Sequence, residues 1–156
     1  MSLTIAIDPG MNGALAVLQE DGTCAFLADL PVITDKSLSW IDGGQLMGMI
    51  LANLAGESAT CIIERVASRP MQGVASVFKF GTVYGSILGV VQSMCIPIEF
   101  VTPVAWKSHY GIGKDKKEAL HKARLLFPMC ELHLKKHDGR AEALLIGRYH
   151  QKNKPT

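Results

Sequence analysis

The sequence predicts an α/β protein in which a layered sheet carries helices on both faces. Three short strand-like segments open the chain, and apolar strand-like runs then alternate with segments of helical periodicity. This order is typical of a sheet that buries both of its faces under helices. Neither internal repeats nor a linker-like stretch interrupt it, so we predict a single domain over residues 1–156.

The individual elements follow from periodicity and from turn residues. Short apolar runs bounded by Gly, Pro, Asp or Ser predict strands over 3–8, 13–18, 23–27, 59–64 and 96–101. Helical spacing and capping residues predict helices over 45–55, 74–93, 103–110, 114–127 and 137–149. Residues 31–44 are predicted as a surface loop and the tail from residue 151 as frayed.

One segment is apolar enough to require a membrane test. Residues 80–98 carry no charged side chain, but they include Gln92, Ser93, Pro97 and three glycines. We therefore interpret them as a buried helix that runs into a buried strand, and not as a membrane span.

The composition excludes a disordered chain, because 48% of the residues are hydrophobic and 19% are charged. Charge is unevenly distributed: residues 1–100 hold 4 Lys/Arg and 9 Asp/Glu, a net −5, whereas residues 101–156 hold 12 and 5, a net +7. All five histidines also lie in the second part. This asymmetry favours a surface for a polyanion, although a solvated pair of amphipathic helices would produce the same count.

The four cysteines show no zinc-ligand spacing. Cys24 and Cys61 lie in apolar strand-like runs, so we expect buried free thiols in a reducing compartment. The N-terminus lacks the basic and long apolar regions of a signal peptide. Together these features predict a cytoplasmic protein.

Four carboxylates form the candidate site. Asp8 and Glu64 each end an apolar strand, and neighbouring parallel strands would place both at one edge of the sheet. Asp138 and Glu142 are four residues apart and share a helix face. Four such groups together would protonate or bind divalent cations, and oxygen ligands favour Mg²⁺ or Mn²⁺. Two such ions would support phosphodiester hydrolysis.

Each carboxylate also has a structural alternative. Asp8 precedes Pro-Gly and fits an ordinary turn. Glu64 could pair with Arg65, and Glu142 could be an exposed helix residue. Asp138 could be the N-cap of the last helix.

The motifs AIDPGMNGALAVL, CIIERV, FKFGTVYGSILGVVQ, TPVAWKSHYGIGKDKKEA and HDGRAEALLIG cover most of the chain. In this order they resemble the RuvC-like Holliday-junction resolvases of the RNase H-like superfamily, especially the phage-type members. The resemblance implies an RNase H-like mixed sheet of about five strands with helices on both faces.

The resemblance also implies roles for the acidic residues. Asp8 and Glu64 correspond to the first two metal-binding carboxylates of the family, and Glu142 corresponds to the last. Many members place their final two acids three residues apart, where this chain has Gly139. We favour Asp138 for the remaining ligand, with His137 as the alternative.

The implied DNA contacts come from basic residues. Lys107 and Lys117 flank Gly111-Ile112-Gly113, as functional lysines do in the family. Lys114, Lys116 and Lys122 fit a solvated basic face at least as well as a functional one. Better-known members carry an aromatic residue shortly after the glutamate, where this chain has Ala67 and Ser68; Arg69 or Met71 could take that place on the DNA.

A glycine stripe recurs along the helix predicted over 74–93, at Gly81, Gly85 and Gly89. The corresponding helix of the family helps to form a two-fold dimer, so the resemblance implies a homodimer. Close packing of the helix on its own sheet is an equal alternative.

As a whole, the resemblance implies a crossover junction endodeoxyribonuclease that nicks four-way DNA junctions symmetrically. It would use two Mg²⁺ ions per active site, with Mn²⁺ as a substitute, and neither a membrane nor a small-molecule cofactor. Three alternatives stay open: another RNase H-like nuclease for branched DNA or RNA–DNA hybrids, a non-catalytic junction-binding protein, and an ATP-binding kinase-like module. A kinase-like module needs a second domain, for which 156 residues leave little room.

Overall fold

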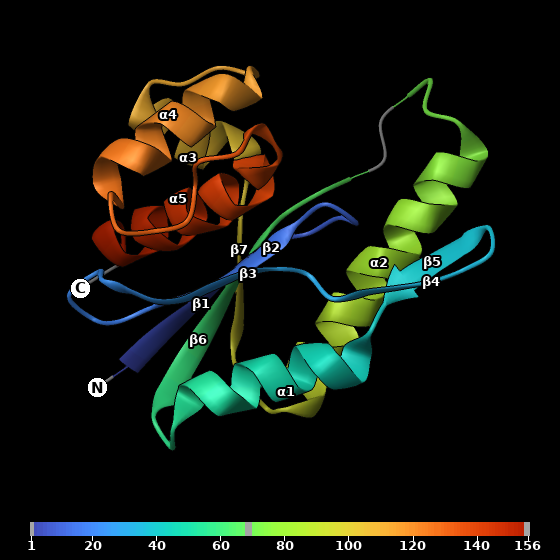
Figure 1. Cartoon of the computed structure of the whole chain (residues 1–156), viewed down its shortest axis with the longest axis horizontal. Coiled ribbons are helices and arrows are strands. Elements are labelled where there is room, and N and C mark those ends of the chain that lie inside the picture. The colour runs from blue at the N-terminus through green and yellow to red at the C-terminus, as the bar shows by residue number, and fades with distance from the viewer. Residues whose placement is uncertain (1, 68–69, 155–156) are drawn as a thin grey trace.

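A computed structural model describes residues 2–67 and 70–154 of the chain. Figure 1 shows a central sheet with helices on either side. The strands are β1 (Ser2–Asp8), β2 (Ala14–Leu18), β3 (Cys24–Asp29), β4 (Val32–Asp35), β5 (Leu38–Ile41), β6 (Ser58–Glu64) and β7 (Ile98–Val101). The α-helices are α1 (Gly43–Leu54), α2 (Val74–Ser93), α3 (Pro103–Tyr110), α4 (Lys116–Leu126) and α5 (Asp138–Lys152), and a 3₁₀ turn (Lys135–His137) precedes α5.

The main sheet has five strands in the order β3-β2-β1-β6-β7. β2 lies antiparallel to both β1 and β3, whereas β1, β6 and β7 run parallel to one another. The mixed α/β fold predicted from the sequence is therefore confirmed, and the predicted helices and main-sheet strands lie within three residues of the observed ones.

The two faces of the sheet differ in side-chain size. Because strand residues alternate between faces, Ile5, Ile7 and Ile63 meet α1 and α2. Ala6, Ala14 and Ala16 point to the other face and join the core of α3, α4 and α5. These small side chains allow α5 to lie close over β1 and β2. In Figure 1, α3, α4 and α5 occupy one side of the sheet, and α1 and α2 the other.

One prediction about the first half of the chain is wrong. The sequence predicts a surface loop over residues 31–44, but β4 and β5 form an antiparallel hairpin there. Asp35 pairs with Leu38, so the turn consists of Lys36 and Ser37, with Lys36 in a left-handed conformation at φ 51°. The two strands are only four residues long and largely exposed, so burial produces no alternation that the sequence would display.

The helix α2 has the predicted bounds but not the predicted burial. Only three of its residues, Val83, Ile87 and Val91, are buried. Val74 and Phe78 are exposed, because the N-terminal part of α2 extends beyond the sheet (Figure 1). By length and composition alone, α2 is also the one helix among the described residues that could cross a membrane, and this is weak evidence.

Two smaller expectations also need correction. Cys61 is buried, but Cys24 is only partly buried, because β3 is an edge strand of the sheet. The tail does not begin at residue 151, since α5 continues to Lys152. The Gln151 side-chain amide donates to the Thr4 hydroxyl (3.2 Å) and to the Gln19 carbonyl (2.8 Å), which fixes the end of α5 on the sheet.

Candidate functional site

The first two carboxylates lie on neighbouring parallel strands. Ile7 of β1 is in register with Ile63 of β6, so the next residues, Asp8 and Glu64, reach the same edge of the sheet. The turn after Asp8 is tight: a Cβ atom at Gly13 would lie 1.9 Å from the Asp8 carbonyl oxygen. Only glycine allows the chain to turn back into β2 so close to Asp8.

The helix α5 brings the other two carboxylates to this edge. A Cβ atom at Gly139 would lie 2.3 Å from the Asn12 carbonyl oxygen, so α5 begins in direct contact with the β1–β2 turn. The Arg140 guanidinium holds the same end of the helix through Asp29, with 2.7 Å between Nε and Oδ1. Asp138 and Glu142 are therefore carried to the edge where β1 and β6 end.

Trp106 is a site residue that the sequence analysis missed. It lies on α3, which begins at the predicted Thr102 cap and Pro103. Its fully buried indole Nε1–H donates to Glu64 Oε2 at 2.6 Å. This bond orients the Glu64 carboxylate at the end of β6. A Trp beside Lys107 in a short helix between two predicted site segments was the available signal.

The carboxylates interact electrostatically. Burial raises the pKa of Asp8 well above its usual range, and the negative charges of Glu142, Glu64 and Asp138 raise it further. Burial also raises the pKa of Glu142, with Lys107 opposing the shift. The charges of the other three predicted carboxylates therefore act on Asp8, which they could not do from separate parts of the surface.

Two lysines approach this group of acids. Lys107 of α3 stabilises the charged form of Glu142, as its effect on the Glu142 pKa indicates. Lys116 of α4 pairs with Asp138, with 2.7 Å between Nζ and Oδ2. Lys117 is exposed on the first turn of α4, where its backbone N–H donates to the Asp115 side chain. Successive helix residues point about 100° apart, so Lys116 and Lys117 cannot both face Asp138.

The remaining predicted residues lie elsewhere. Arg69 and Ser68 are outside the described residues. His137 is buried, and its Nδ1 accepts a hydrogen bond from the Leu134 backbone N–H at 3.4 Å. The first residue of α5 is Asp138, whose carboxylate pairs with Lys116, and α5 has no side-chain cap.

The donor chemistry of the site suits a hard cation. Its acidic groups offer only carboxylate oxygens, and burial, with the neighbouring carboxylates adding to it, raises the pKa values of Asp8 and Glu142. Among the described residues, no three His, Cys, Asp or Glu side chains are already arranged as a metal-binding cluster. The Lys116 ammonium supplies the positive charge next to Asp138.

The sheet order β3-β2-β1-β6-β7, with acids at the ends of β1 and β6, defines an RNase H-like fold of the RuvC type. RuvC of Thermus thermophilus, solved in complex with a Holliday junction substrate, superposes with a TM-score of 0.64 at 17% identity; the match covers 95% of this chain and 92% of that one. A second Thermus thermophilus RuvC structure gives a TM-score of 0.55 at 18% identity, with the same coverage. No protein-family profile and no curated protein matches the sequence.

Proposed function

We propose that this protein is a metal-dependent endonuclease that resolves four-way DNA junctions by paired symmetric nicks. The observation that best supports the proposal is that Glu64, Asp138 and Glu142 lie near enough to Asp8, at one sheet edge of a RuvC-like fold, for their charges to act on it. Phosphodiester hydrolysis requires an activated water and a stabilised leaving oxygen, and bound Mg²⁺ or Mn²⁺ supplies both. The four carboxylates are the residues that would hold two such ions.

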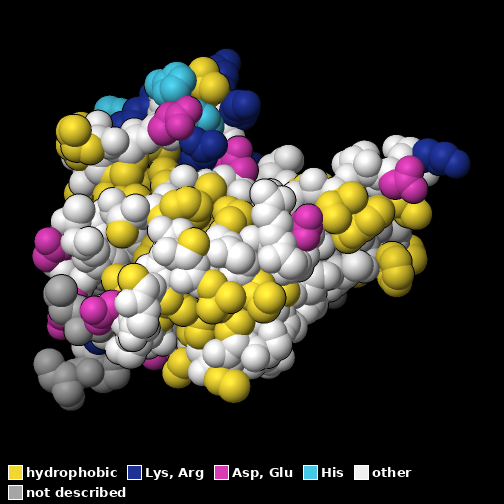
Figure 2. Space-filling view, turned by 60° about the horizontal axis from the view of Figure 1, so that its bottom comes forward, with side chains coloured by type: hydrophobic (Ala, Val, Ile, Leu, Met, Phe, Trp, Pro, Cys, Tyr) yellow, Lys and Arg dark blue, Asp and Glu magenta, His cyan; other side chains and the backbone are white. Residues whose placement is uncertain are grey.

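Basic residues beside the carboxylates would position the DNA backbone. A groove of about 420 Å³ lies between α3 and the loop that follows it, and Lys107 and Lys114 line it together with Ile112 and Gly113. Lys107 also acts on Glu142, so the groove adjoins the acidic site. A phosphate backbone in this groove would pass next to the carboxylates. Lys, Arg and His side chains gather over the same end of the molecule in Figure 2.

The proposal includes a homodimer, because two symmetric nicks need two active sites related by a two-fold axis. A Cβ atom at Gly81, Gly85 or Gly89 would meet nothing within 4 Å, so the stripe does not serve packing against the chain's own sheet. This supports the dimer over the alternative interpretation, in which the helix packs closely on its own sheet. Apolar side chains of the same region, including Phe78 and Leu38, are also exposed. A second copy would cover this surface.

The decisive experiment is cleavage of a labelled synthetic four-way junction beside duplex, flap and RNA–DNA hybrid substrates, with Mg²⁺, Mn²⁺ or EDTA. We expect symmetric cuts in the junction that require metal. Asp8→Asn and Glu64→Gln should each lower the rate by roughly a thousandfold or more while junction binding persists. If only the RNA–DNA hybrid is cut, the proposal that the four-way junction is the substrate is wrong. If the unmodified protein binds the junction but does not cut it, the proposal that the protein is a nuclease is wrong.

The lysines can be compared in the same assay. Lys116→Met removes the partner of Asp138, whereas Lys117→Met changes its neighbour on the same helix turn. For either variant, if the lysine removed binds a DNA phosphate, the slope of the logarithm of the junction-binding constant against the logarithm of salt concentration should become shallower by about one unit. We expect only Lys116→Met to alter the metal concentration needed for cutting, and equal metal requirements would contradict this assignment.

A further inference from the structure

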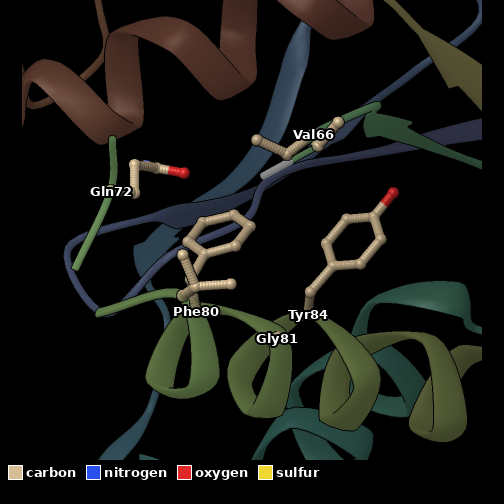
Figure 3. Close-up of a pocket in the computed structure, with 7 residues that line it drawn as sticks. Val66, Gln72, Phe80, Gly81 and Tyr84 are labelled. Atoms are coloured by element: carbon tan, nitrogen blue, oxygen red, sulfur yellow. The ribbon is translucent and has the colours of Figure 1, made fainter. Parts of the chain in front are cut away.

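Pockets lie on both faces of the sheet. On the α2 face, beside the end of β6, a pocket of about 450 Å³ has Val66 opposite the Phe80 and Tyr84 rings (Figure 3). It adjoins the α2 surface that a second copy would cover in the proposed dimer. On the other face, a pocket of about 330 Å³ lies between the turn before β3, the end of α4 and the C-terminal half of α5. Cys24 and Cys130 both line this second pocket.

Cys24 and Cys130 are far apart in the sequence, but their side chains meet. A side-chain hydrogen bond joins the two thiol groups. Both side chains are partly buried and pack against the core of α3, α4 and α5. Because they also line a pocket, a small reagent can reach them. The other two cysteines differ from this pair, since Cys61 is buried in β6 and Cys95 is exposed after α2.

The backbone at both cysteines has room to adjust. Cys24 begins an edge strand, and the pairing of β2 with β3 shifts register between Val17 and Leu18, so a bulge lies next to Cys24. Cys130 lies in the turn after α4, where its backbone N–H donates to the Phe127 carbonyl at 3.1 Å. The sulfur atoms of a disulfide are about 2.0 Å apart, closer than two hydrogen-bonded thiols. A bulge and a turn allow this short movement.

We infer that Cys24 and Cys130 are a redox-active pair, which glutathione disulfide converts into a reversible intramolecular disulfide. The Cys130 thiolate attacks one sulfur of the oxidant, and one glutathione leaves. The Cys24 sulfur then attacks the Cys130 sulfur of this mixed disulfide, and the second glutathione leaves. Two protein thiols are thereby oxidised to a disulfide and the oxidant is reduced to two thiols, which take up the two protons that the cysteines lose.

The environment of Cys24 sets the order of these two attacks. Burial and the neighbouring Cys130 raise the pKa of the Cys24 thiol to about 12. Only the thiolate is an effective nucleophile, so Cys24 does not make the first attack at neutral pH. Once Cys130 is part of a mixed disulfide it carries no charge. The electrostatic effect of Cys130 on Cys24 then disappears, which favours the second attack.

The disulfide would lie away from the candidate active site. Cys24 is in register with Leu18 at one end of β2, whereas Asp8 is in register with Ala14 at the other end. The bond would tie the segment between α4 and α5 to the edge of the sheet and would close a loop of roughly 100 residues, which restricts the unfolded chain. In a reducing compartment such a disulfide is transient and responds to the redox state.

The direct test oxidises the full-length protein with glutathione disulfide and maps its peptides without reduction. We expect an intramolecular link between Cys24 and Cys130. The melting temperature of the linked protein should exceed that of the reduced protein by roughly 10 °C, and dithiothreitol should reverse the change. Cys95→Ser is the matched control: it removes the exposed thiol and should form the same link with the same rise.

Two variants test the order of attack. In Cys24→Ser, the reaction should stop at a mixed disulfide of Cys130 with glutathione, without the rise in melting temperature. In Cys130→Ser, the buried Cys24 should take up glutathione at least roughly tenfold more slowly than Cys130 does in Cys24→Ser.

Three results would overturn the inference: a mixed disulfide that persists at Cys130 in the unmodified protein, a link that joins two chains, or an equal rise in melting temperature for Cys24→Ser. The peptide map of the unmodified protein decides the question even if a variant fails to fold. No DNA enters these measurements, so the inference can fail while the proposed nuclease stands.

Discussion

The helices α5 and α2 cover opposite faces of the same sheet, and their composition does not predict which is buried. α5 carries several charged side chains, yet eight of its residues are buried. α2 is far more apolar and has three buried residues. Both contain glycines, but those of α5 touch the sheet or its β1–β2 turn, and those of α2 face open space.

The difference shows that the position of a helix over the sheet, and not its hydrophobicity, decides burial here. α5 lies over the centre, where β1 and β2 present alanines and Gly147 fits against Leu18 and Ala6. α2 passes the sheet only with its C-terminal half. Figure 2 shows the result on the surface, where most of the Lys, Arg and His side chains in view gather in one region and yellow apolar patches cover much of the rest. An apolar helix left uncovered in this way is the surface that the proposed dimer would cover.

The largest effect should come from a single methyl group at the start of α5. In Gly139→Ala, the new Cβ would collide with the Asn12 carbonyl oxygen, a backbone atom that cannot rotate away. We expect a loss of about 3 kcal/mol in the free energy of unfolding, measured by urea denaturation. A loss below about 1 kcal/mol would show that α5 does not approach the β1–β2 turn so closely.

The second prediction concerns the hydrogen bond from Trp106 on α3 to Glu64 at the end of β6. Trp106→Phe removes the donor to Glu64 Oε2 and leaves a small cavity, so we expect about 2 kcal/mol of destabilisation. Junction cleavage should fall as well, because the Glu64 carboxylate loses its orientation. The exposed Trp40 on the β4–β5 hairpin offers the matched control, and Trp40→Phe should change neither quantity.

The third prediction tests whether the charged, buried Asp8 carboxylate destabilises the folded protein. Burial and neighbouring acids raise the folded-state pKa of Asp8 above its unfolded value, so the folded state binds the proton more tightly. This favours folding at low pH, and the advantage is lost as pH rises through the folded pKa. At pH 8 without metal, Asp8→Asn should therefore be more stable than the unmodified protein, by about 1–2 kcal/mol.

Thermal melts at pH 8 and at pH 4 check this prediction, and the stabilisation should shrink at the lower pH. Added Mg²⁺ should raise the melting temperature of the unmodified protein and not that of Asp8→Asn. A stabilisation that is the same at both pH values would contradict the electrostatic origin.

The smallest effect is the same Gly-to-Ala change placed on α2. Gly85→Ala introduces a Cβ into open space and improves helix propensity, so the monomer should gain about 0.5–1 kcal/mol. Its sign is opposite to that of Gly139→Ala, which makes the pair a direct test of the comparison. If a second copy covers the stripe, Gly85→Ala should also weaken the dimer in sedimentation equilibrium, and a more stable dimer would contradict that interface.

The sequence by itself determined the fold class, the order of the main-sheet strands and helices along the chain and the four candidate acids. Periodicity and capping are local properties, so the bounds of α2 and α3 could be predicted to the residue. Asp8 and Glu64, at the ends of β1 and β6, could be predicted to lie close together because neighbouring parallel strands end at the same edge of the sheet.

Only the tertiary structure decided which residues surround those acids. The bond from Trp106 to Glu64 spans 42 residues, and Lys116 rather than Lys117 faces Asp138 because of how α4 is rotated against α5. The β4–β5 hairpin, the exposure of α2 and the pocket beside Glu64 likewise depend on where whole elements lie. Such long-range contacts follow from the packing of elements against one another, and no local pattern in the sequence encodes that packing.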